Sequence, residues 1–448
     1  MEQVKLDRIL RWCRGTVVDR KILKSYCTGI STDTRTIRNG ELFIAIKGEN
    51  FDGHNFLDAA LRKGAAAVVS ADENAVTNGR TIVVRDTQKA LGDIAAGYRR
   101  QFSAYVIGIT GSDGKTTTKE FLKKTLSLKY SVKGTEGNLN NQLGLPLSIF
   151  SMDRKTDFCV LEMGMNRRNE LRFLGKIARP HAGVITNVAS AHLGFFRSGL
   201  EIAEAKSELI ETLAGEKLCL LNYDNKFFPF LKKKAHRCKT LSFGLRKGAE
   251  TRGILMEEGN DFFNFGIEDT HHVFRINFWN ISMIYPALVA FAFGNRFRIG
   301  PEKIADVFAG ISPLPGRGLV RKAGGITVID ETYNANPNSM KAALQNLSRK
   351  RFRRKIAVLG DMAELGRFSS LFHRNTGLSA RNLDVDILVT FGSESRLISE
   401  TSGKEYRHFK DVDRINRYLS GIAKRGDVFL VKGSRIMRME RIVNHLCS

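Results

Sequence analysis

The chain has 448 residues, which is too long for one ordinary hydrophobic core and predicts two or three domains. A hydrophobic content of 42% beside 26% charged residues is typical of a folded protein and excludes a disordered one. The net charge of +25 leaves open nucleic-acid binding, an anionic substrate or a generally basic surface. Because basic residues are spread along the chain, with no tract interleaved with aromatic residues, we favour a solvated basic surface that steers small anionic substrates.

The chain has no sequence signal for export or for a membrane span. The N-terminal segment MEQVKLDRIL is charged and amphipathic, unlike a signal peptide. The longest apolar stretch, 281–293, is interrupted by Ser282 and Pro286 and predicts a buried helix. Six cysteines without a C-x-x-C pair favour a reducing, cytoplasmic location, with neither a disulfide framework nor a zinc site.

Apolar, strand-like runs alternate with helical stretches in three successive units, which predicts an α/β protein of three domains: residues 1–100, 101–312 and 313–448. The segment 311–318, ISPLPGRG, is rich in proline and glycine and indicates a linker before the third unit. Buried strands alternating with helices predict parallel sheets in the second and third units. The predicted strands are 41–46, 66–69 and 81–84 in the first unit, 106–109, 158–161, 183–186 and 218–221 in the second, and 326–329, 356–359, 387–390 and 428–431 in the third.

The most informative segment is 106–118, VIGITGSDGKTTT. An apolar run leads into a loop with Gly111 and Gly114, and Lys115 and Thr116 then open a helix-like stretch. Such a loop cradles nucleotide phosphates because glycines let backbone N–H groups approach the oxygens and the helix N-terminus favours negative charge. The lysine then reaches the β- and γ-phosphates, and the threonine hydroxyl is suited to Mg²⁺.

Two features depart from the usual phosphate loop. The spacing G-x-x-x-x-G-K-[ST] would need a glycine at Ile109, so this loop is a shorter variant. Asp113 places a carboxylate in the loop, and we expect it to repel phosphate unless it points to solvent or to Mg²⁺.

Polar residues follow the strands of the second unit, where ligands of open α/β sheets bind. Glu162 follows the strand 158–161, and His192 lies shortly after the strand 183–186. Alone, each is more often an ordinary surface or loop residue, but their joint position favours Mg²⁺ ligands beside a nucleotide. Taken by itself, Lys206 is predicted to lie on a helix surface and to pair with neighbouring acids. The Gly- and Asn-rich segment 135–146 suits either a ligand-binding loop or a plain turn cluster.

At this point the chain resembles the Mur ligases, over essentially its whole length. Two late segments, YNANP-x-SM and LGDMAELG, are similar in particular to the branch that uses D-alanyl-D-alanine. The resemblance is carried by an ordered series of segments: STDTR (31–35), FIAIKGENFDGHNF (43–56), TGSDGKTTTKE (110–120), TEGNLNNQLGLP (135–146), LEMGMN (161–166), ITNVASAHLGFF (185–196), AKSE (205–208), PGR (315–317), DETYNANPNSM (330–340), LGDMAELG (359–366) and VKGSR (431–435).

The resemblance implies a three-domain, ATP- and Mg²⁺-dependent amide ligase of peptidoglycan precursor synthesis. The first domain would hold UDP-N-acetylmuramoyl-tripeptide, the central P-loop domain ATP, and the C-terminal Rossmann-like domain D-alanyl-D-alanine. Transfer of the γ-phosphoryl group to the tripeptide carboxylate would give an acyl phosphate, which the dipeptide amine then attacks. The resemblance also implies a monomer that binds no nucleic acid.

Roles carry over residue by residue. Lys115, Glu162, His192 and Lys206 would be catalytic, and Thr116, Glu162, His192 and Lys206, the last as a CO₂-derived carbamate, would hold metal. ATP would contact Gly111, Asp113, Gly114, Lys115, Thr116, Thr117, Asn280, Arg317, Asp330 and Asn334. The UDP-substrate would contact Ser31, Asp33, Arg35, Lys47, Gly48, Asn138 and Asn141, and the dipeptide Asn336, Asp361, Glu364, Ser434 and Arg435.

The chain departs from the family pattern at one place, where Trp279 and Met283 stand for the usual histidine and second asparagine. The tryptophan keeps a ring that could stack on adenine. Another Mur-type or folylpolyglutamate-synthase-like ligase, a nucleic-acid-binding NTPase and an inactive homologue are the alternatives. The separate first unit and the two late segments favour the D-alanyl-D-alanine branch.

Overall fold

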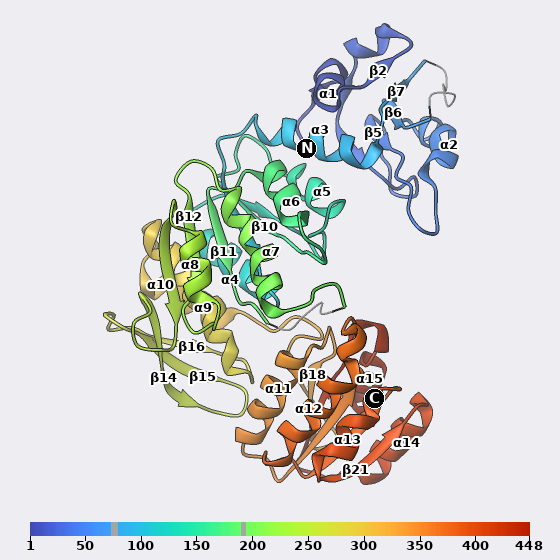
Figure 1. The fold of residues 1–448 in the computed structure, drawn as a ribbon. Helices are drawn as coiled ribbons and strands as arrows, with labels where there is room; N and C mark the ends of the chain where they lie inside the picture. The colour runs from blue at the N-terminus through green and yellow to red at the C-terminus, as the bar shows by residue number, and fades with distance from the viewer. Residues whose placement is uncertain (73–78, 190–193) are drawn as a thin grey trace.

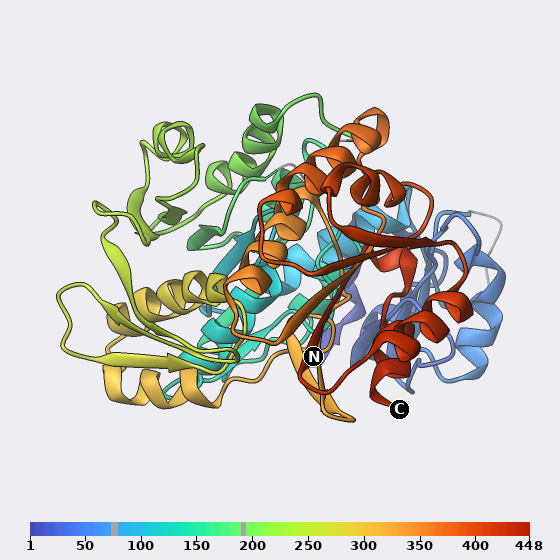
Figure 2. The ribbon, with the colours of Figure 1, turned by 90° about the horizontal axis from the view of Figure 1, so that it is seen from below.

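The computed structural model describes residues 1–72, 79–189 and 194–448 and arranges them in three α/β bodies in chain order (Figure 1). Each body contains one large sheet, and helices cover both faces of each sheet. Figure 2, the view from below, shows the strands β14–β16 on one side of the molecule and the N-terminal elements on the opposite side.

The first body holds a five-stranded sheet of order β2-β7-β6-β5-β4, parallel except for the β2–β7 pair. Side chains of α2 pack on one face of this sheet, and those of α1 and α3 pack on the other. Helix α3 also contacts the middle body, because Gly92 lies against Phe173 and Ile177 and the Arg99 guanidinium donates to the carbonyl of Ala178. Its elements are β1 (Val4–Lys5), α1 (Leu6–Cys13), β2 (Thr16–Val17), η1 (Arg20–Lys24), β3 (Tyr26–Cys27), β4 (Gly29–Ser31), β5 (Glu41–Ile44), η2 (Gly53–Phe56), α2 (Leu57–Arg62), β6 (Ala67–Ser70), β7 (Thr81–Val83) and α3 (Thr87–Arg99).

The middle body holds a nine-stranded sheet of order β16-β15-β14-β13-β12-β11-β8-β10-β9. Strands β8 to β14 are parallel, and β15 and β16 add an antiparallel extension. Helices α4, α9 and α10 pack on one face, and α5 to α8 pack on the other. Its elements are β8 (Tyr105–Thr110), α4 (Lys115–Leu126), β9 (Val132–Gly134), α5 (Gly144–Ile149), β10 (Phe158–Glu162), α6 (Glu170–Ala178), β11 (Ala182–Ile185), α7 (Gly199–Glu211), β12 (Leu218–Asn222), α8 (Phe228–Lys234), β13 (Lys239–Gly244), β14 (Thr251–Glu258), β15 (Phe263–Ile267), β16 (Val273–Ile276), η3 (Ile281–Met283), α9 (Ile284–Arg296) and α10 (Pro301–Gly310).

The third body holds a six-stranded sheet of order β17-β18-β22-β19-β20-β21, in which only the edge strand β17 is antiparallel. Helices α11 to α13 pack on one face, and α14 and α15 pack on the other. Its elements are β17 (Leu319–Ala323), β18 (Ile326–Glu331), α11 (Pro337–Arg349), β19 (Arg354–Gly360), η4 (Gly366–Phe368), α12 (Ser369–Arg381), β20 (Ile387–Phe391), α13 (Arg396–Ser402), β21 (Glu405–Phe409), α14 (Val412–Ile422), β22 (Asp427–Lys432), η5 (Arg435–Met437) and α15 (Glu440–Cys447).

The predicted α/β architecture is confirmed, and a strand lies at each predicted strand position. The segment 311–318 lies between α10 and β17 without regular structure, and the apolar stretch 281–293 forms η3 and most of the buried helix α9, as expected. No helix in the described ranges is long and apolar enough to cross a bilayer. Each sheet lies within one of the three predicted units, whose exact boundaries stay a prediction.

Candidate functional site

The predicted phosphate loop is present, between β8 and α4 at the carboxyl end of the middle sheet. Gly114 adopts a φ of +81°, and a Cβ at Gly111 would lie 1.8 Å from the Thr186 hydroxyl oxygen at the end of β11. The loop therefore needs glycine for two reasons, backbone conformation at one end and close approach at the other. The Lys115 ammonium folds over the loop and donates to the carbonyls of Gly111, at 2.9 Å, and Ser112, at 3.4 Å.

Glu162 ends β10 beside this loop, with only 3% of its surface exposed. Its carboxylate accepts hydrogen bonds from the Thr116 hydroxyl, at 2.8 Å, and from the Asn140 amide, at 2.7 Å. The backbone N–H of Glu162 donates to the Thr135 hydroxyl at 3.0 Å. Two of the predicted metal-binding groups are thus in contact, and they form an oxygen-lined pair of the kind that Mg²⁺ prefers.

Asn140 belongs to this site although the sequence did not single it out. It lies in the segment 135–146, whose composition did flag the loop, but spacing alone does not reveal which of its asparagines faces the carboxylate. His192, another predicted metal ligand, lies outside the described residues.

Lys206 is buried in α7, with 2% of its surface exposed, so the interpretation of a helix-surface lysine is wrong. The acids of α7 pair elsewhere, for example Glu204 with Arg168 and Glu208 with the backbone of α6. Within the described residues, the Lys206 ammonium has no hydrogen-bond or ion-pair partner. Burial, and then the nearby charge of Lys115, lower the pKa of Lys206 well below its ordinary value.

Family models cover most of the chain. A "Mur ligase family, catalytic domain" model matches residues 26–99, a "Mur ligase middle domain" model matches 109–294, and a "Mur ligase, glutamate ligase domain" model matches 316–435. The UDP-N-acetylmuramoyl-tripeptide–D-alanyl-D-alanine ligase of Bacillus subtilis is 35% identical over 98% of each chain.

This chain belongs to the Mur ligase family. Two solved structures are similar to it over nearly their full length. MurF from Acinetobacter baumannii has a TM-score of 0.93 at 29% identity, with coverage of 100% of this chain and 99% of the other. The MurF ligase from Thermotoga maritima, solved in complex with ADP, has a TM-score of 0.84 at 32% identity, with coverage of 95% and 98%.

The predicted UDP-substrate residues of this Mur ligase lie in two places. Ser31, Asp33, Arg35, Lys47 and Gly48 follow the carboxyl ends of β4 and β5 in the first body, whereas Asn138 and Asn141 lie in the loop before α5. The Asp33 carboxylate binds the Arg35 guanidinium at 2.6 Å. This hydrogen-bonded pair lowers the pKa of Asp33 to about 2, so the carboxylate is charged at neutral pH.

Most of the residues near the linker that were predicted to contact ATP interact with other protein groups in this structure. Asp330 is buried and accepts from the backbone of Gly316 and from Thr332. The Arg317 guanidinium lies over the Tyr333 ring, 3.7 Å from its centroid, and Asn334 is exposed nearby.

Trp279 has no exposed surface, so the suggested stacking of its ring on adenine is wrong for this arrangement of the bodies. The indole packs in the apolar cluster of the third body with Leu344 and Leu347, and its Nε1 has no hydrogen-bond partner among the residues that the structure describes. The adjacent Asn280 caps η3 and accepts from the Asn346 amide at 2.8 Å. This pair of residues therefore joins the middle and third bodies.

Two of the predicted dipeptide residues, Asp361 and Ser434, lie together at the carboxyl end of the third sheet, just after β19 and β22. The Ser434 hydroxyl donates to the carbonyl of Ala335 at 3.2 Å and accepts from the N–H of Ala363 at 2.7 Å. The Ser434 N–H donates to the Asp361 carbonyl at 3.0 Å. The Asp361 carboxylate is fully engaged by the backbone N–H groups of residues 393–395, which lower its pKa against the effect of burial.

Glu364 and Arg435, two further predicted dipeptide residues, make other contacts. The Glu364 carbonyl accepts from the N–H of Gly194 in the middle body at 2.9 Å. Arg435 is paired with Glu440 at 3.2 Å at the start of α15. Binding roles for these residues stay predictions.

Proposed function

We propose that this Mur ligase joins D-alanyl-D-alanine to the terminal carboxylate of UDP-N-acetylmuramoyl-tripeptide, with ATP converted to ADP and phosphate, in peptidoglycan precursor synthesis. The observation that carries the proposal is the 35% identity, over 98% of both chains, to the Bacillus subtilis ligase of that name. The meeting of Lys115, Thr116 and Glu162 at the carboxyl end of one sheet supports it, because phosphoryl transfer needs these groups together.

The described residues fit ATP and Mg²⁺. Thr116 and Glu162 would hold the ion through hydroxyl and carboxylate oxygens, with Asn140 fixing the second carboxylate oxygen. Bound Mg²⁺ neutralises charge on the phosphates. The Lys115 ammonium, which here donates to two loop carbonyls, would contribute a further positive charge to phosphates held by the loop.

The chemistry proceeds in two steps. A tripeptide carboxylate oxygen forms a bond to the γ-phosphorus while the bond to the β-phosphate oxygen breaks and ADP leaves. The dipeptide amine then attacks the acyl carbon, the C–O bond to phosphate breaks, and a proton leaves the nitrogen. Because both steps depend on placement, the protein's part is mostly to position the groups and stabilise charge, which contributes about 7–11 kcal/mol in favourable intramolecular cases.

We further propose that Lys206 carries a carbamate. A neutral amine adds to CO₂: a C–N bond forms as one C–O π bond opens and a proton leaves the nitrogen, which turns a buried neutral amine into an anion. The burial of Lys206, its lack of a partner among the described residues and its lowered pKa all favour the neutral, reactive amine. An anion there is suited to holding a metal near the loop, where an ammonium would repel it.

Rescue tests the carbamate. Lys206→Ala should lose turnover, and formate or acetate should restore part of it by supplying a carboxylate in the vacated space. In ¹³CO₂-equilibrated buffer, a carbamate carbon signal should be present in the parent protein and absent from the variant. Absence of both rescue and signal would overturn the carbamate.

The division of labour follows the three bodies. We assign the UDP-sugar to residues 1–100, ATP to 101–312 and the dipeptide to 313–448. We place the enzyme in the cytoplasm, in keeping with six cysteines that form no C-x-x-C pair, and we propose that it acts as a monomer.

Phosphate release from Mg-ATP tests the whole proposal. UDP-N-acetylmuramoyl-tripeptide and D-alanyl-D-alanine are supplied singly and together, and the product is weighed by mass spectrometry. We expect release that needs both substrates and a product heavier by one dipeptide less one water. Release that needs folate or nucleic acid instead would favour the alternative enzymes and overturn the proposal.

A further inference from the structure

The carboxylate of Asp113 stands in a loop that is otherwise built for anions, and the structure shows where it points. Its Oδ1 accepts a hydrogen bond at 2.6 Å from the side-chain amide of Asn336, which is 223 residues away in the third body. Its Oδ2 faces the Asn187 amide at 3.5 Å, and the Asp113 N–H donates to the Asn187 side-chain oxygen at 2.8 Å. The carboxylate is therefore held toward the third body.

Asn336 is equally fixed on its own side. It is the N-cap of α11, where its Oδ1 accepts from the N–H of Ser339 at 2.9 Å and its own N–H donates to the Ser339 hydroxyl at 3.0 Å. One amide group thus caps the helix with its oxygen and binds the phosphate loop with its nitrogen. A single side chain therefore links the N-terminal end of α11 to Asp113.

The opposite end of α11 is attached to the middle body by a different and larger set of bonds. Asn346 donates to Asn280 at 2.8 Å, Lys350 donates to Glu258 at 2.8 Å, and the N–H of Arg351 donates to Asn260 at 2.9 Å. These bonds fix the C-terminal end of α11, and the Asp113–Asn336 bond links its N-terminal end to the middle body. The arrangement has the form of a hinge at one end of a helix and a latch at the other.

We propose that Asp113 is a positioning residue that latches the third body onto the phosphate loop. The inference rests on the proposed function, since the latch would place the dipeptide-binding body against the site of acyl-phosphate formation. The latch also accounts for an acid in a phosphate loop. The Asp113 carboxylate is directed toward the third body, where it accepts a hydrogen bond from Asn336. A charge-assisted hydrogen bond of this kind is stronger than one between neutral groups, so its loss should shift the balance away from the closed arrangement.

An exchange of the two side chains tests the latch. Asn336→Asp keeps a good N-cap but sets two carboxylates against each other, so the latch should open. Adding Asp113→Asn to that variant restores one donor and one acceptor across the same gap. Asn338→Asp is the matched control, because it adds the same charge two positions along on an exposed part of α11.

Two measurements are made on the full chain: the radius of gyration by small-angle X-ray scattering, with and without Mg-ATP, and kcat and KM for D-alanyl-D-alanine. We expect Asn336→Asp to increase the radius of gyration and to lower kcat/KM about tenfold or more, and the exchanged pair to recover most of both. The control variant should match the parent protein.

The two readouts separate the latch from the proposed function. An unchanged radius of gyration in Asn336→Asp, or an exchanged pair no more compact than Asn336→Asp, would overturn the latch. A parent protein without dipeptide-dependent turnover would overturn the proposed function, and scattering would still decide the latch. Compactness restored without turnover would keep the latch and assign Asn336 a direct contact with substrate as well.

Discussion

Two lysines of the middle body are buried to a similar degree but differ in what they touch. Lys119 in α4 donates to the Thr135 carbonyl at 2.8 Å and pairs with Glu120, so its charge is compensated. Lys206 has no such partner among the described residues. Burial without a partner disfavours the charged form of a lysine, and groups perturbed in this way are concentrated at functional sites.

Lys206→Met tests that reasoning through stability. Because the variant removes an amine that burial disfavours, we expect a melting temperature equal to or above that of the parent, with turnover lost. The native pKa of Lys206 is lowered, so in the pH range between that pKa and the ordinary value of 10.5 the unfolded chain holds a proton that the native protein lacks. The parent's stability relative to the variant should therefore rise from pH 7 to pH 9.

Urea unfolding in CO₂-depleted buffer at the two pH values measures this difference. Lys119→Met is the comparison, since it removes a lysine with partners and should lower stability at both pH values. A drop in stability for Lys206→Met that is independent of pH would mean that the lysine is structural.

Asp33→Ala addresses the UDP-substrate site. The pair Asp33–Arg35 is exposed, so its loss should affect binding rather than folding, and KM for the UDP-substrate should rise with kcat little changed. Steady-state kinetics measure both constants. Asp7→Ala removes a similar exposed pair, with Arg11 in α1, and should change neither. A fall in kcat alone would remove Asp33 from the UDP site.

At the scale of elements, the phosphate loop depends on two neighbouring strands as well as on its own residues. Thr186, at the end of β11, donates to the carbonyl of Asp113 at 2.6 Å and leaves space only for a glycine at position 111. The carboxylate of Glu162, at the end of β10, accepts a hydrogen bond from the hydroxyl of Thr116 in the first turn of α4. The parallel order β11-β8-β10 therefore brings residues from three segments to one point.

Gly111→Ala should disturb this junction. The added Cβ would collide with the Thr186 hydroxyl, so either the loop or β11 must shift, and we expect ATP binding to weaken at least tenfold with a loss of about 1–3 kcal/mol of stability. Equilibrium binding of ATP and thermal unfolding measure the two effects. Gly421→Ala in α14, where a Cβ meets open space, should be neutral or slightly stabilising. Unimpaired ATP binding in Gly111→Ala would contradict the role given to this loop.

Some strands, such as β14 and β21, could not be predicted from the sequence, and the reason is physical. Strand β14 has a single buried residue, and β21 is an edge strand whose first three residues are exposed, so neither shows the apolar run that marked the predicted strands. Their stability comes from hydrogen-bonded neighbours, β13 and β15 for one and β20 for the other. The residue pattern of one segment does not show which strands it will pair with, so it cannot predict a strand that depends on its neighbours.

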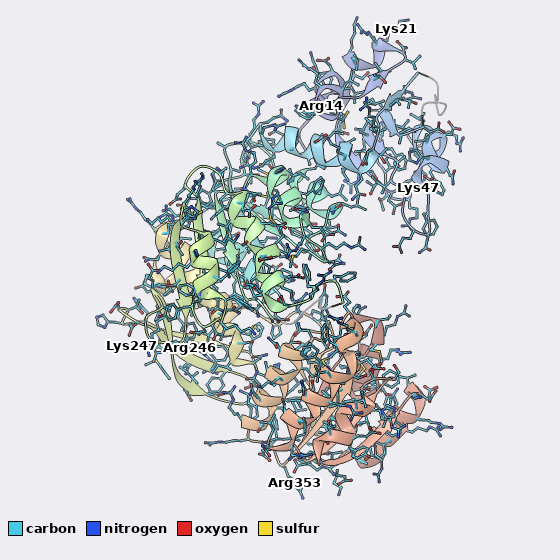
Figure 3. The ribbon with its side chains drawn as sticks, in the orientation of Figure 1. Arg14, Lys21, Lys47, Arg246, Lys247 and Arg353 are labelled. Carbon is cyan, nitrogen blue, oxygen red and sulfur yellow. The ribbon has the colours of Figure 1, made fainter. Side chains whose placement is uncertain are left out.

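At the scale of the whole molecule, the basic charge is distributed over all three bodies. Figure 3 labels exposed examples on each: Arg14, Lys21 and Lys47 on the first, Arg246 and Lys247 on the middle, and Arg353 on the third. This distribution supports long-range attraction of anionic substrates, because both UDP-N-acetylmuramoyl-tripeptide and ATP are multiply charged.

Ionic strength tests this interpretation. Between about 0.01 M and 0.15 M the Debye length falls from about 30 Å to about 8 Å, so kcat/KM for the UDP-substrate should fall while kcat stays nearly constant. Initial-rate kinetics in sodium chloride, at fixed Mg²⁺, measure both. A rate insensitive to salt, or ATP hydrolysis stimulated by DNA, would contradict the proposed role of the charge.

The sequence by itself determined the α/β class, the three-unit order, the phosphate loop and the family, because these rest on local signals: apolar runs, glycine spacing and motifs in fixed order. It did not determine which polar groups meet. The sequence did not reveal that Lys206 and Trp279 are buried. It also did not reveal the contact of Asn140 with Glu162 or the bond between Asp113 and Asn336, which are 223 residues apart. Only the parallel sheets and the packing of one body on another bring such groups within hydrogen-bonding distance, so only the tertiary structure decided them.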